Sequence, residues 1–288
     1  DGVHLGHRYL IEKLIQRTWE EDLISGVVTF NPHPHSVLYP CDRLPWLSSL
    51  ESRVNKLQEL DVSFVVVLSF TPELAQLSAR EFTVLLKKYL KMRGLMIGPD
   101  FALGRGREGD ASSLRSLGQE IRFTVETVPP FKVDGEIVSS TLIRQALSQG
   151  EIKKVKKLMG GYFSLSGKII SADKRGQALG FPTANLDIEA EQALPSNGVY
   201  ATITYVDGRQ FVAATNIGTR PTFGESKKTV ETYILDYEGN LYGKEIEVGF
   251  VDKLRDEKCF ASAQELKAQI EKDVEQVRTI VTGDIINA

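Results

Sequence analysis

The feature that most constrains the fold is a change in the spacing of apolar residues near residue 160. Before it, segments with helical spacing alternate with short β-branched runs over 24–30 and 62–68. Strands that alternate with helices predict a parallel sheet with helices on both faces. After it, short stretches of alternating apolar and polar residues are separated by turn signals such as Asp207-Gly208. This second pattern predicts an antiparallel barrel, closed by one long helix over 263–281.

Two domains are therefore expected. The boundary lies in a helical stretch over 140–159, which ends at Gly160-Gly161, and it divides the chain into domains 1–159 and 160–288. The length of 288 residues agrees, because one domain has on the order of 150 residues. With 42% hydrophobic and 25% charged residues the chain can bury its cores, and no apolar run approaches the ~20 residues of a membrane helix. No membrane association is expected.

Charge and cysteine content restrict the partners and the compartment. The formal net charge is −3, which provides no basic field for nucleic acid. Cys41 and Cys259 form no CxxC pair, so neither a disulfide framework nor a zinc knuckle is predicted, and a cytoplasmic location fits. Because the chain opens on Asp1-Gly2 and not on Met, we expect that an N-terminal piece has been lost.

All four histidines lie near the start of the chain, as His4-Leu-Gly-His7 and His33-Pro-His35. Clustered imidazoles can hold zinc, but neither pair has the spacing of a helical zinc site and no cysteine is adjacent. The alternative is phosphate chemistry, because two imidazoles and the free N–H groups of a helix start would surround one point, where Gly6 has no side chain to block a nucleotide. A helix cap with surface histidines is the simpler hypothesis.

A second element supports phosphate chemistry. Ser139-Ser140-Thr141 and Arg144 open a predicted helix, so hydroxyls, N-terminal amides and a guanidinium can converge on a triphosphate. The two elements together resemble the nucleotidylyltransferase superfamily, whose members attack the α-phosphate of a nucleoside triphosphate and release pyrophosphate.

Two other glycine patterns are weaker. Residues 104–109 fit GxGxxG, but a dinucleotide site needs the first glycine directly after its strand, and residues 99–103 intervene. We expect instead a flexible, positively charged loop that closes over phosphates. Residues 161–168 lack the spacing of a Walker loop, and Ile169 stands where a hydroxyl would hold magnesium.

The second domain carries a candidate cation site. Thr183 and Asn185 lie two residues apart in a predicted turn, so in extended backbone their oxygens share a face and can bind one hard cation. Lys174 and nearby glycine amides would flank the phosphates. Glu231, expected at the barrel mouth, could accept a proton from an alcohol that attacks the γ-phosphate. An Asx turn and a solvated strand face are the simpler alternatives.

The whole chain resembles the prokaryotic bifunctional riboflavin kinase/FMN adenylyltransferase family, also called FAD synthetases. The segments that carry the resemblance are DGVHLGH (1–7), TFNPHP (29–34), IGPDFALGRGREGD (97–110), VSSTLIR (138–144), LGFPTANL (179–186), GVYAT (198–202), NIGTRPTFG (216–224), VETYILDYEGNLYG (230–243) and LRDEKCF (254–260). Each motif alone is weak or moderate, but their joint order over both domains is specific.

The resemblance implies a Rossmann-like N-terminal nucleotidylyltransferase sheet and a six-stranded C-terminal barrel. It implies that the barrel phosphorylates riboflavin with Mg²⁺ and ATP, and that the first domain transfers AMP from ATP to FMN, giving FAD. The implied adenylyltransferase residues are His4, Gly6, His7, Asp100, Ser140, Thr141 and Arg144 for ATP, of which His4, His7 and Arg144 are catalytic, and Asn31 and His33 for the flavin phosphate. The implied kinase residues are Lys174, Gly176, Gly180, Thr183 and Asn185 for phosphate and metal, and Glu231 as base.

The chain also departs from the family. A strand and a GxF segment usually precede the DGVH motif, so we expect the first domain to lack its central strand. Ala102, Leu103, Ala172 and Gln177 replace residues that are usual in the family. Two alternatives remain: a member that retains only the kinase, and a flavin- or nucleotide-binding module without turnover. The sequence leaves oligomerisation open.

Overall fold

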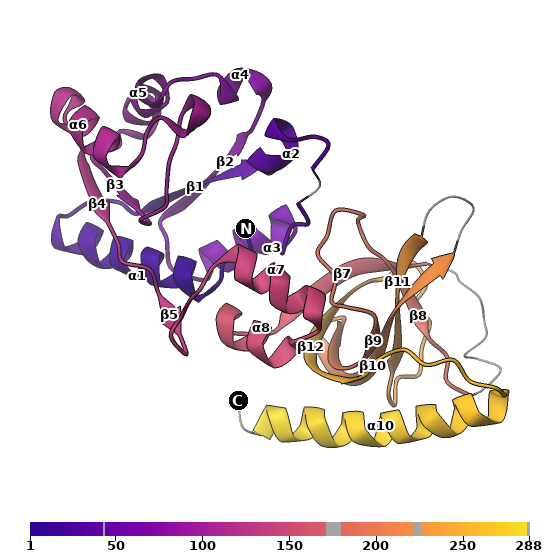
Figure 1. The fold of residues 1–288 in the computed structure, drawn as a ribbon. Helices are drawn as coiled ribbons and strands as arrows, with labels where there is room; N and C mark the ends of the chain where they lie inside the picture. Colours follow the sequence, from indigo (N-terminus) through magenta and orange to yellow (C-terminus); the bar gives the residue numbers. More distant parts are fainter. Residues whose placement is uncertain (43, 171–179, 222–225, 287–288) are drawn as a thin grey trace. The chain divides into compact units, whose positions relative to one another are not determined.

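The computed structural model describes residues 1–42, 44–170, 180–221 and 226–286. They form two compact units, Asp1–Ser140 and Thr141–Ala288, which are described here one at a time (Figure 1). The units divide nearer the N-terminus than the predicted boundary between 159 and 160. The reason is that α8 (Ile152–Met159) packs its buried face on strands of the barrel, together with α7 (Ser140–Gln149) before it.

The first unit contains two pairs of parallel strands. β1 (Gly26–Asn31) pairs with β2 (Phe64–Ser69), and β3 (Gly94–Ile97) pairs with β4 (Thr124–Thr127). Among the described residues the two pairs are separate sheets, and a cavity of about 1490 Å³ is lined by residues of both β1 and β3.

Helices cover both faces of these strands (Figure 1). α1 (Leu5–Glu20) and α3 (Leu50–Gln58) share a buried apolar cluster with β1 and β2, while α6 (Ala111–Ile121) packs on β3 and β4. α5 (Ala79–Leu90) begins at a capping box and contacts α6. The remaining short elements are α2 (Pro34–Leu38), α4 (Pro72–Ala75), η1 (Arg105–Arg107), β5 (Lys132–Val133) and β6 (Glu136–Ile137).

The second unit is the predicted six-stranded antiparallel barrel, closed in the order β10-β11-β8-β7-β12-β9. Its strands are β7 (Phe163–Ile170), β8 (Ala184–Asp187), β9 (Gly198–Val206), β10 (Arg209–Pro221), β11 (Ser226–Ile234) and β12 (Glu245–Arg255). Its fully buried side chains include Tyr200 and three threonines whose hydroxyls form a chain, with Thr202 2.8 Å from Thr215 and Thr215 donating to Thr232 at 2.9 Å.

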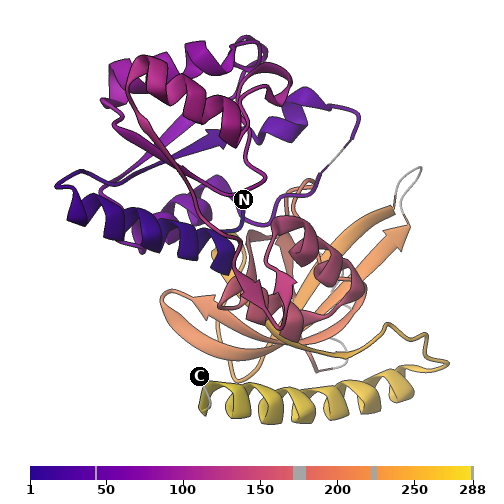
Figure 2. The same ribbon diagram turned by 60° about the vertical axis from the view of Figure 1, so that its left-hand side comes forward.

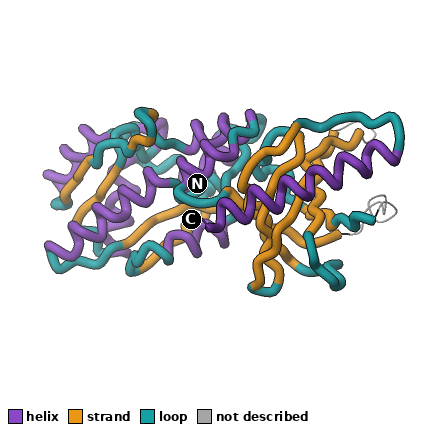
Figure 3. The backbone as a smooth tube through the Cα atoms, turned by 90° about the horizontal axis from the view of Figure 1, so that it is seen from below, coloured by secondary structure: helices purple, strands orange, loops and turns teal. Residues whose placement is uncertain are grey.

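The predicted closing helix is confirmed as α10 (Ala263–Ile286), which runs along the outside of the barrel (Figures 2 and 3). Val277 and Val281 are fully buried against Ala201, Ile203 and Val251. Alternate residues of β9 therefore face outward to α10, and the residues between them face the barrel interior.

One strand was missed by the sequence analysis. Asn185 was placed in a turn, because Pro182 and the small polar residues after it are typical of turns. The structure corrects this: Asn185 lies inside β8, which pairs with both β7 and β11. Pairing on both sides satisfies its backbone polar groups, and this outweighs the local turn preference.

Candidate functional site

The His4-to-His7 segment forms the start of α1. His4 is buried and caps the helix, since its Nδ1 accepts a hydrogen bond from the backbone N–H of His7 at 3.4 Å. The two rings are stacked, with 3.8 Å between centroids and 23° between planes. The helix-cap hypothesis is therefore correct for His4, and the cap also fixes the position of His7.

His7 is suited to act as a neutral imidazole. Its burial, and secondarily the adjacent His4, lowers the pKa of His7 well below its usual value. Its Nδ1 atom is buried and has no hydrogen-bond partner within the described part of the chain. A buried polar atom of this kind is unusual and is available to a ligand.

Within the first unit, Ser140 lies next to the segment that precedes the histidine motif. The Ser140 hydroxyl, at the first residue of α7, donates to the backbone carbonyl of Asp1 at 3.0 Å. A Cβ on Gly6 would lie 3.1 Å from the His4 ring and 3.1 Å from the carbonyl oxygen of Val138. Gly6 is therefore needed for this close packing, a constraint that the sequence did not reveal.

The cavity of the first unit gathers most of the predicted adenylyltransferase residues. His4, Gly6, His7, His33, Asp100 and Ser140 all line it. His33 caps α2, its Nδ1 accepting from the N–H of His35 at 3.2 Å. Asn31 is exposed at the end of β1 and is not among the lining residues. Thr141 and Arg144 belong to the second unit, where Thr141 is exposed and burial lowers the pKa of the partly exposed Arg144.

The glycine-rich loop after β3 is not a dinucleotide turn. β3 ends at Ile97, well before Gly104, whose missing Cβ leaves room for the backbone of Ala79. The loop is also held more firmly than expected, because Arg105 N–H donates to Leu77 and Glu108 accepts from Ala79 N–H at 2.7 Å. The expected closing of this positively charged loop over phosphates stays a prediction.

The kinase residues of the second unit meet through strand register. Asn185 of β8 is paired with Glu231 of β11, and Glu231 is paired with Asn216 of β10. The side chains of directly paired residues lie on the same face, with Cβ atoms about 4.5–5.5 Å apart. Asn185 is buried, whereas Glu231 and Asn216 are partly exposed. The three form one polar row across three strands.

This row lies on the outer face of the barrel. Val230 and Thr232, on either side of Glu231 in sequence, are buried in the interior, and Asn216 shares its face of β10 with Ala214, which packs toward α10. Glu231 was expected at the barrel mouth, and the structure corrects this position. Successive side chains of a strand point to opposite faces, so Glu231 points outward between the inward-facing Val230 and Thr232.

Only some of the other kinase candidates lie among the described residues. Thr183 is partly exposed, two residues before Asn185, and Gly180 has φ of 88° with no neighbour near its missing Cβ. Lys174 and Gly176 lie outside the described residues, as do Ala172 and Gln177. No cluster of three or more His, Cys, Asp or Glu side chains that could hold a metal ion occurs in the described ranges.

The sequence analysis missed two site residues. Asn216 and Glu257 were each noted only as part of a matching segment. The structure puts Asn216 of β10 beside Glu231 of β11. It also brings Glu257 next to Gly218 of β10, and Asn197 donates to the Glu257 carboxylate at 3.0 Å. Strand pairing across the barrel was the missing information, since no local pattern encodes it.

The comparisons with known proteins agree with this division of the chain. Residues 1–142 match the FAD synthetase family and residues 159–281 match the riboflavin kinase family. No helix among the described residues combines the length and apolar character needed to cross a bilayer. A solved structure titled as a macrolide-efflux protein from Streptococcus pneumoniae has a TM-score of 0.88 and 29% identity, covering 96% of this chain and 91% of that one.

Curated relatives match over nearly the whole chain. The bifunctional riboflavin kinase/FMN adenylyltransferase of Escherichia coli K12 is 37% identical over 276 residues, which cover 95% of this chain and 88% of the relative. The proteins of the same name from Haemophilus influenzae and Listeria monocytogenes are 34% and 33% identical, each over 280 residues, covering 96% of this chain and 91% and 89% of the relatives. The chain therefore belongs to the family of bifunctional riboflavin kinase/FMN adenylyltransferases.

Proposed function

We propose that the row of Asn185 and Glu231 carries the kinase reaction of this chain, and that the histidine site carries the adenylyltransferase reaction. The C-terminal half is the riboflavin kinase and the N-terminal half is the FMN adenylyltransferase. The observation that carries the kinase assignment is the register that places Asn185 beside Glu231. The proposed functional domains are residues 1–159 and 160–288. In this division α7 and α8 belong to the sequence of the first domain, although they lie in the same compact unit as the barrel.

Magnesium fits the donor set at Asn185. The amide oxygen of Asn185 and the hydroxyl of Thr183 are neutral, hard donors, which suit Mg²⁺ while leaving its charge for the phosphates. When bound, the ion would neutralise charge on the phosphates of ATP. Lys174, Gly176 and Gly180 are proposed to flank those phosphates, as in the sequence analysis.

Glu231 is the proposed general base of the kinase. Its carboxylate accepts the proton of the terminal hydroxyl of riboflavin while that oxygen bonds to the γ-phosphorus of ATP. The bond from this phosphorus to the bridging oxygen breaks, and ADP leaves. The products are FMN and ADP, and the proton remains on Glu231 until it passes to solvent.

The adenylyltransferase reaction is proposed for the histidine site. A phosphate oxygen of FMN attacks the α-phosphorus of ATP, and pyrophosphate leaves. His4, His7, Ser140, Thr141 and Arg144 are the proposed ligands of the ATP phosphates, with Gly6 permitting their close approach. Asp100, Asn31 and His33 are proposed for the nucleotide and flavin. The lowered pKa of His7 supports a role as a neutral hydrogen-bonding group.

Small molecules are the proposed partners, and the cytoplasm is the proposed location. The net charge of −3 argues against nucleic acid as a substrate. Cys41 and Cys259 are both free and exposed, which suits a reducing compartment.

A chromatographic time course with riboflavin, ATP and Mg²⁺ tests both sites. We expect FMN to rise first and then to convert into FAD. FMN that accumulates without FAD would favour a kinase-only protein. Absence of FMN despite riboflavin binding would contradict the roles of Thr183, Asn185 and Glu231 and favour a binding module.

A further inference from the structure

The polar row of the kinase site continues past Asn216 to a second carboxylate. A Cβ on Gly218 would lie 2.5 Å from Oε1 of Glu257 and 3.2 Å from Nδ2 of Asn216. The carboxylate and the amide therefore face the same small space, which exists because residue 218 has no side chain. Asn216 thus lies between two glutamates, with Glu231 beside it on β11 and Glu257 beyond it.

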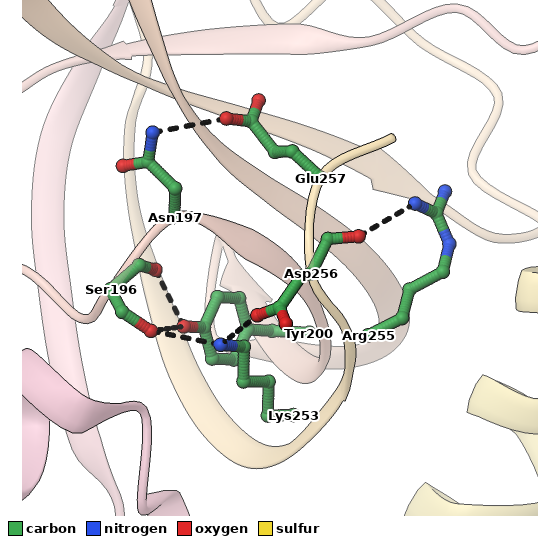
Figure 4. A network of polar contacts seen from close by, with 7 residues as sticks. All are labelled: Ser196, Asn197, Tyr200, Lys253, Arg255, Asp256 and Glu257. Carbon is green, nitrogen blue, oxygen red and sulfur yellow. Dashed lines mark hydrogen bonds and ion pairs between the residues drawn. The ribbon is translucent and has the colours of Figure 1, made fainter. Parts of the chain in front are cut away.

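Hydrogen bonds to Glu257 and to the residues just before it hold Glu257 in this position. Figure 4 shows Asn197 donating to the Glu257 carboxylate, and the same amide also donates to Thr219 at 2.9 Å. One step earlier in the chain, Asp256 accepts from Lys253 at 2.6 Å, and Lys253 also donates to Ser196 at 3.0 Å. The loop that contains Ser196 is thereby joined to the end of β12.

A buried ion pair fixes the same segment to α10. Arg255 makes a bidentate contact with Asp273, at 3.0 Å from Nε and 2.7 Å from its terminal nitrogen, and Asp273 is only 3% exposed. A bidentate pair of this kind restricts orientation as well as distance. Although Glu257 itself is exposed, its backbone position is therefore well determined.

We propose that Asn216 is a positioning residue of the kinase, whose side-chain amide holds the Glu231 carboxylate in the orientation that accepts the proton of riboflavin. This inference rests on the proposed role of Glu231. An asparagine amide has two N–H donors, so one can be directed to Glu231 while the other is directed to Glu257.

The test uses the full chain and measures FMN formation against riboflavin concentration and pH. Asn216→Asp replaces the donor by a second carboxylate beside Glu231. We expect kcat at neutral pH to fall about tenfold or more and to recover at higher pH, with the acidic limb of the kcat profile displaced upward by about one to two pH units. Asn216→Ala should lower kcat about tenfold without that displacement, and KM for riboflavin should change less than about threefold.

Among the described strand residues, the other titratable side chains with the outward orientation of Glu231 are Lys168, Asp187, Tyr205, Tyr233, Glu245 and Glu247, and Glu257 lies at Gly218. From α10, Arg278 lies near Tyr233. They are identical in the wild-type protein and the Asn216 variants, so they affect every profile alike. The matched charge control is Asn240→Asp, in an exposed turn where the new carboxylate can still accept from Tyr242 N–H. It should retain the wild-type profile.

A second pair of variants tests the same arrangement without a new charge. Gly218→Ala would displace Glu257 and crowd Asn216, so we expect a lower kcat at an unchanged pH profile. Gly161→Ala is the control, because nothing lies within 4 Å of its added Cβ, and its kcat should equal that of the wild type. Thermal unfolding of each variant verifies folding, and the Gly218 pair stands in if Asn216→Asp does not fold.

Glu231→Gln distinguishes a failure of the proposed base from a failure of the proposed positioning role of Asn216. If this variant retains the wild-type rate, the proposed base is wrong, and the inference about Asn216 fails with it. If it abolishes FMN formation while the folded Asn216 and Gly218 variants keep kcat and pH profile within about twofold of wild type, only the positioning role is overturned. A loss confined to KM would also overturn it, because Asn216 would then bind riboflavin.

Discussion

At the scale of single residues, His7 shows how a helix start produces a neutral imidazole. The cap made by His4 stacks the two rings, and one protonated ring would then face the other at 3.8 Å. Burial adds the cost of removing a charge from water. The result is a ring that can donate and accept hydrogen bonds without adding a positive charge to the site.

We expect His7 to remain neutral at pH 6. Because its pKa is lower in the folded than in the unfolded protein, its contribution to stability is present above the unfolded value of about 6.5 and is lost as the pH falls toward the folded pKa. An NMR titration of the ring nitrogens measures this directly, with the urea-unfolded chain as reference. Equal midpoints in the two states would contradict the assignment.

At the scale of elements, two ion pairs attach α10 to the barrel, one of them buried and the other exposed to solvent. The Arg255–Asp273 pair joins β12 to α10, with side chains 15% and 4% exposed. The Arg278–Asp236 pair joins α10 to the end of β11, with side chains 50% and 71% exposed. Loss of one buried partner leaves the other charge without compensation, whereas a solvated partner loses little.

Arg255→Gln should therefore lower the free energy of unfolding of the barrel by about 3–5 kcal/mol, while Arg278→Gln should lower it by less than about 1 kcal/mol. Urea unfolding followed by far-UV circular dichroism measures both. Trp19 and Trp46, the two tryptophans of the chain, lie in the first unit, so the fluorescence transition of that unit provides an internal control. Equal effects of the two substitutions would show that burial of the pair is not decisive.

At the scale of the whole molecule, the residues proposed for the two reactions lie in different parts of one chain. The kinase row lies on three strands of the barrel, and the stacked histidines lie at the start of α1. The product of the first reaction is the substrate of the second. A substitution in one site should therefore affect the overall conversion only at its own step.

We expect Glu231→Gln to form no FAD from riboflavin but to form FAD from supplied FMN at the wild-type rate. His7→Asn should show the reverse pattern, making FMN from riboflavin while FAD formation falls about 100-fold or more, the range for loss of a positioned acid–base or phosphate-binding group. Chromatography of both flavins distinguishes the variants, each of which is a control for the other. FAD formation from FMN that falls equally in both would show that the sites are not independent.

Local patterns in the sequence were sufficient for the types of element. Alternation of apolar residues identified the barrel strands other than β8, and helical spacing identified α10, because both periodicities depend on neighbouring residues. The motifs that contain His4, His7, Asn185 and Glu231 were also recognisable in order along the chain.

Contacts between distant residues were decided only by the tertiary structure. β8 is a strand because partners on both sides pair with it, and α8 joins the barrel because its apolar face is buried there. Asn216 and Glu231 are neighbours because β10 pairs with β11, and Glu257 reaches Gly218 because the barrel closes. Register and closure depend on the packing of all six strands at once, so no single segment of the sequence contains them.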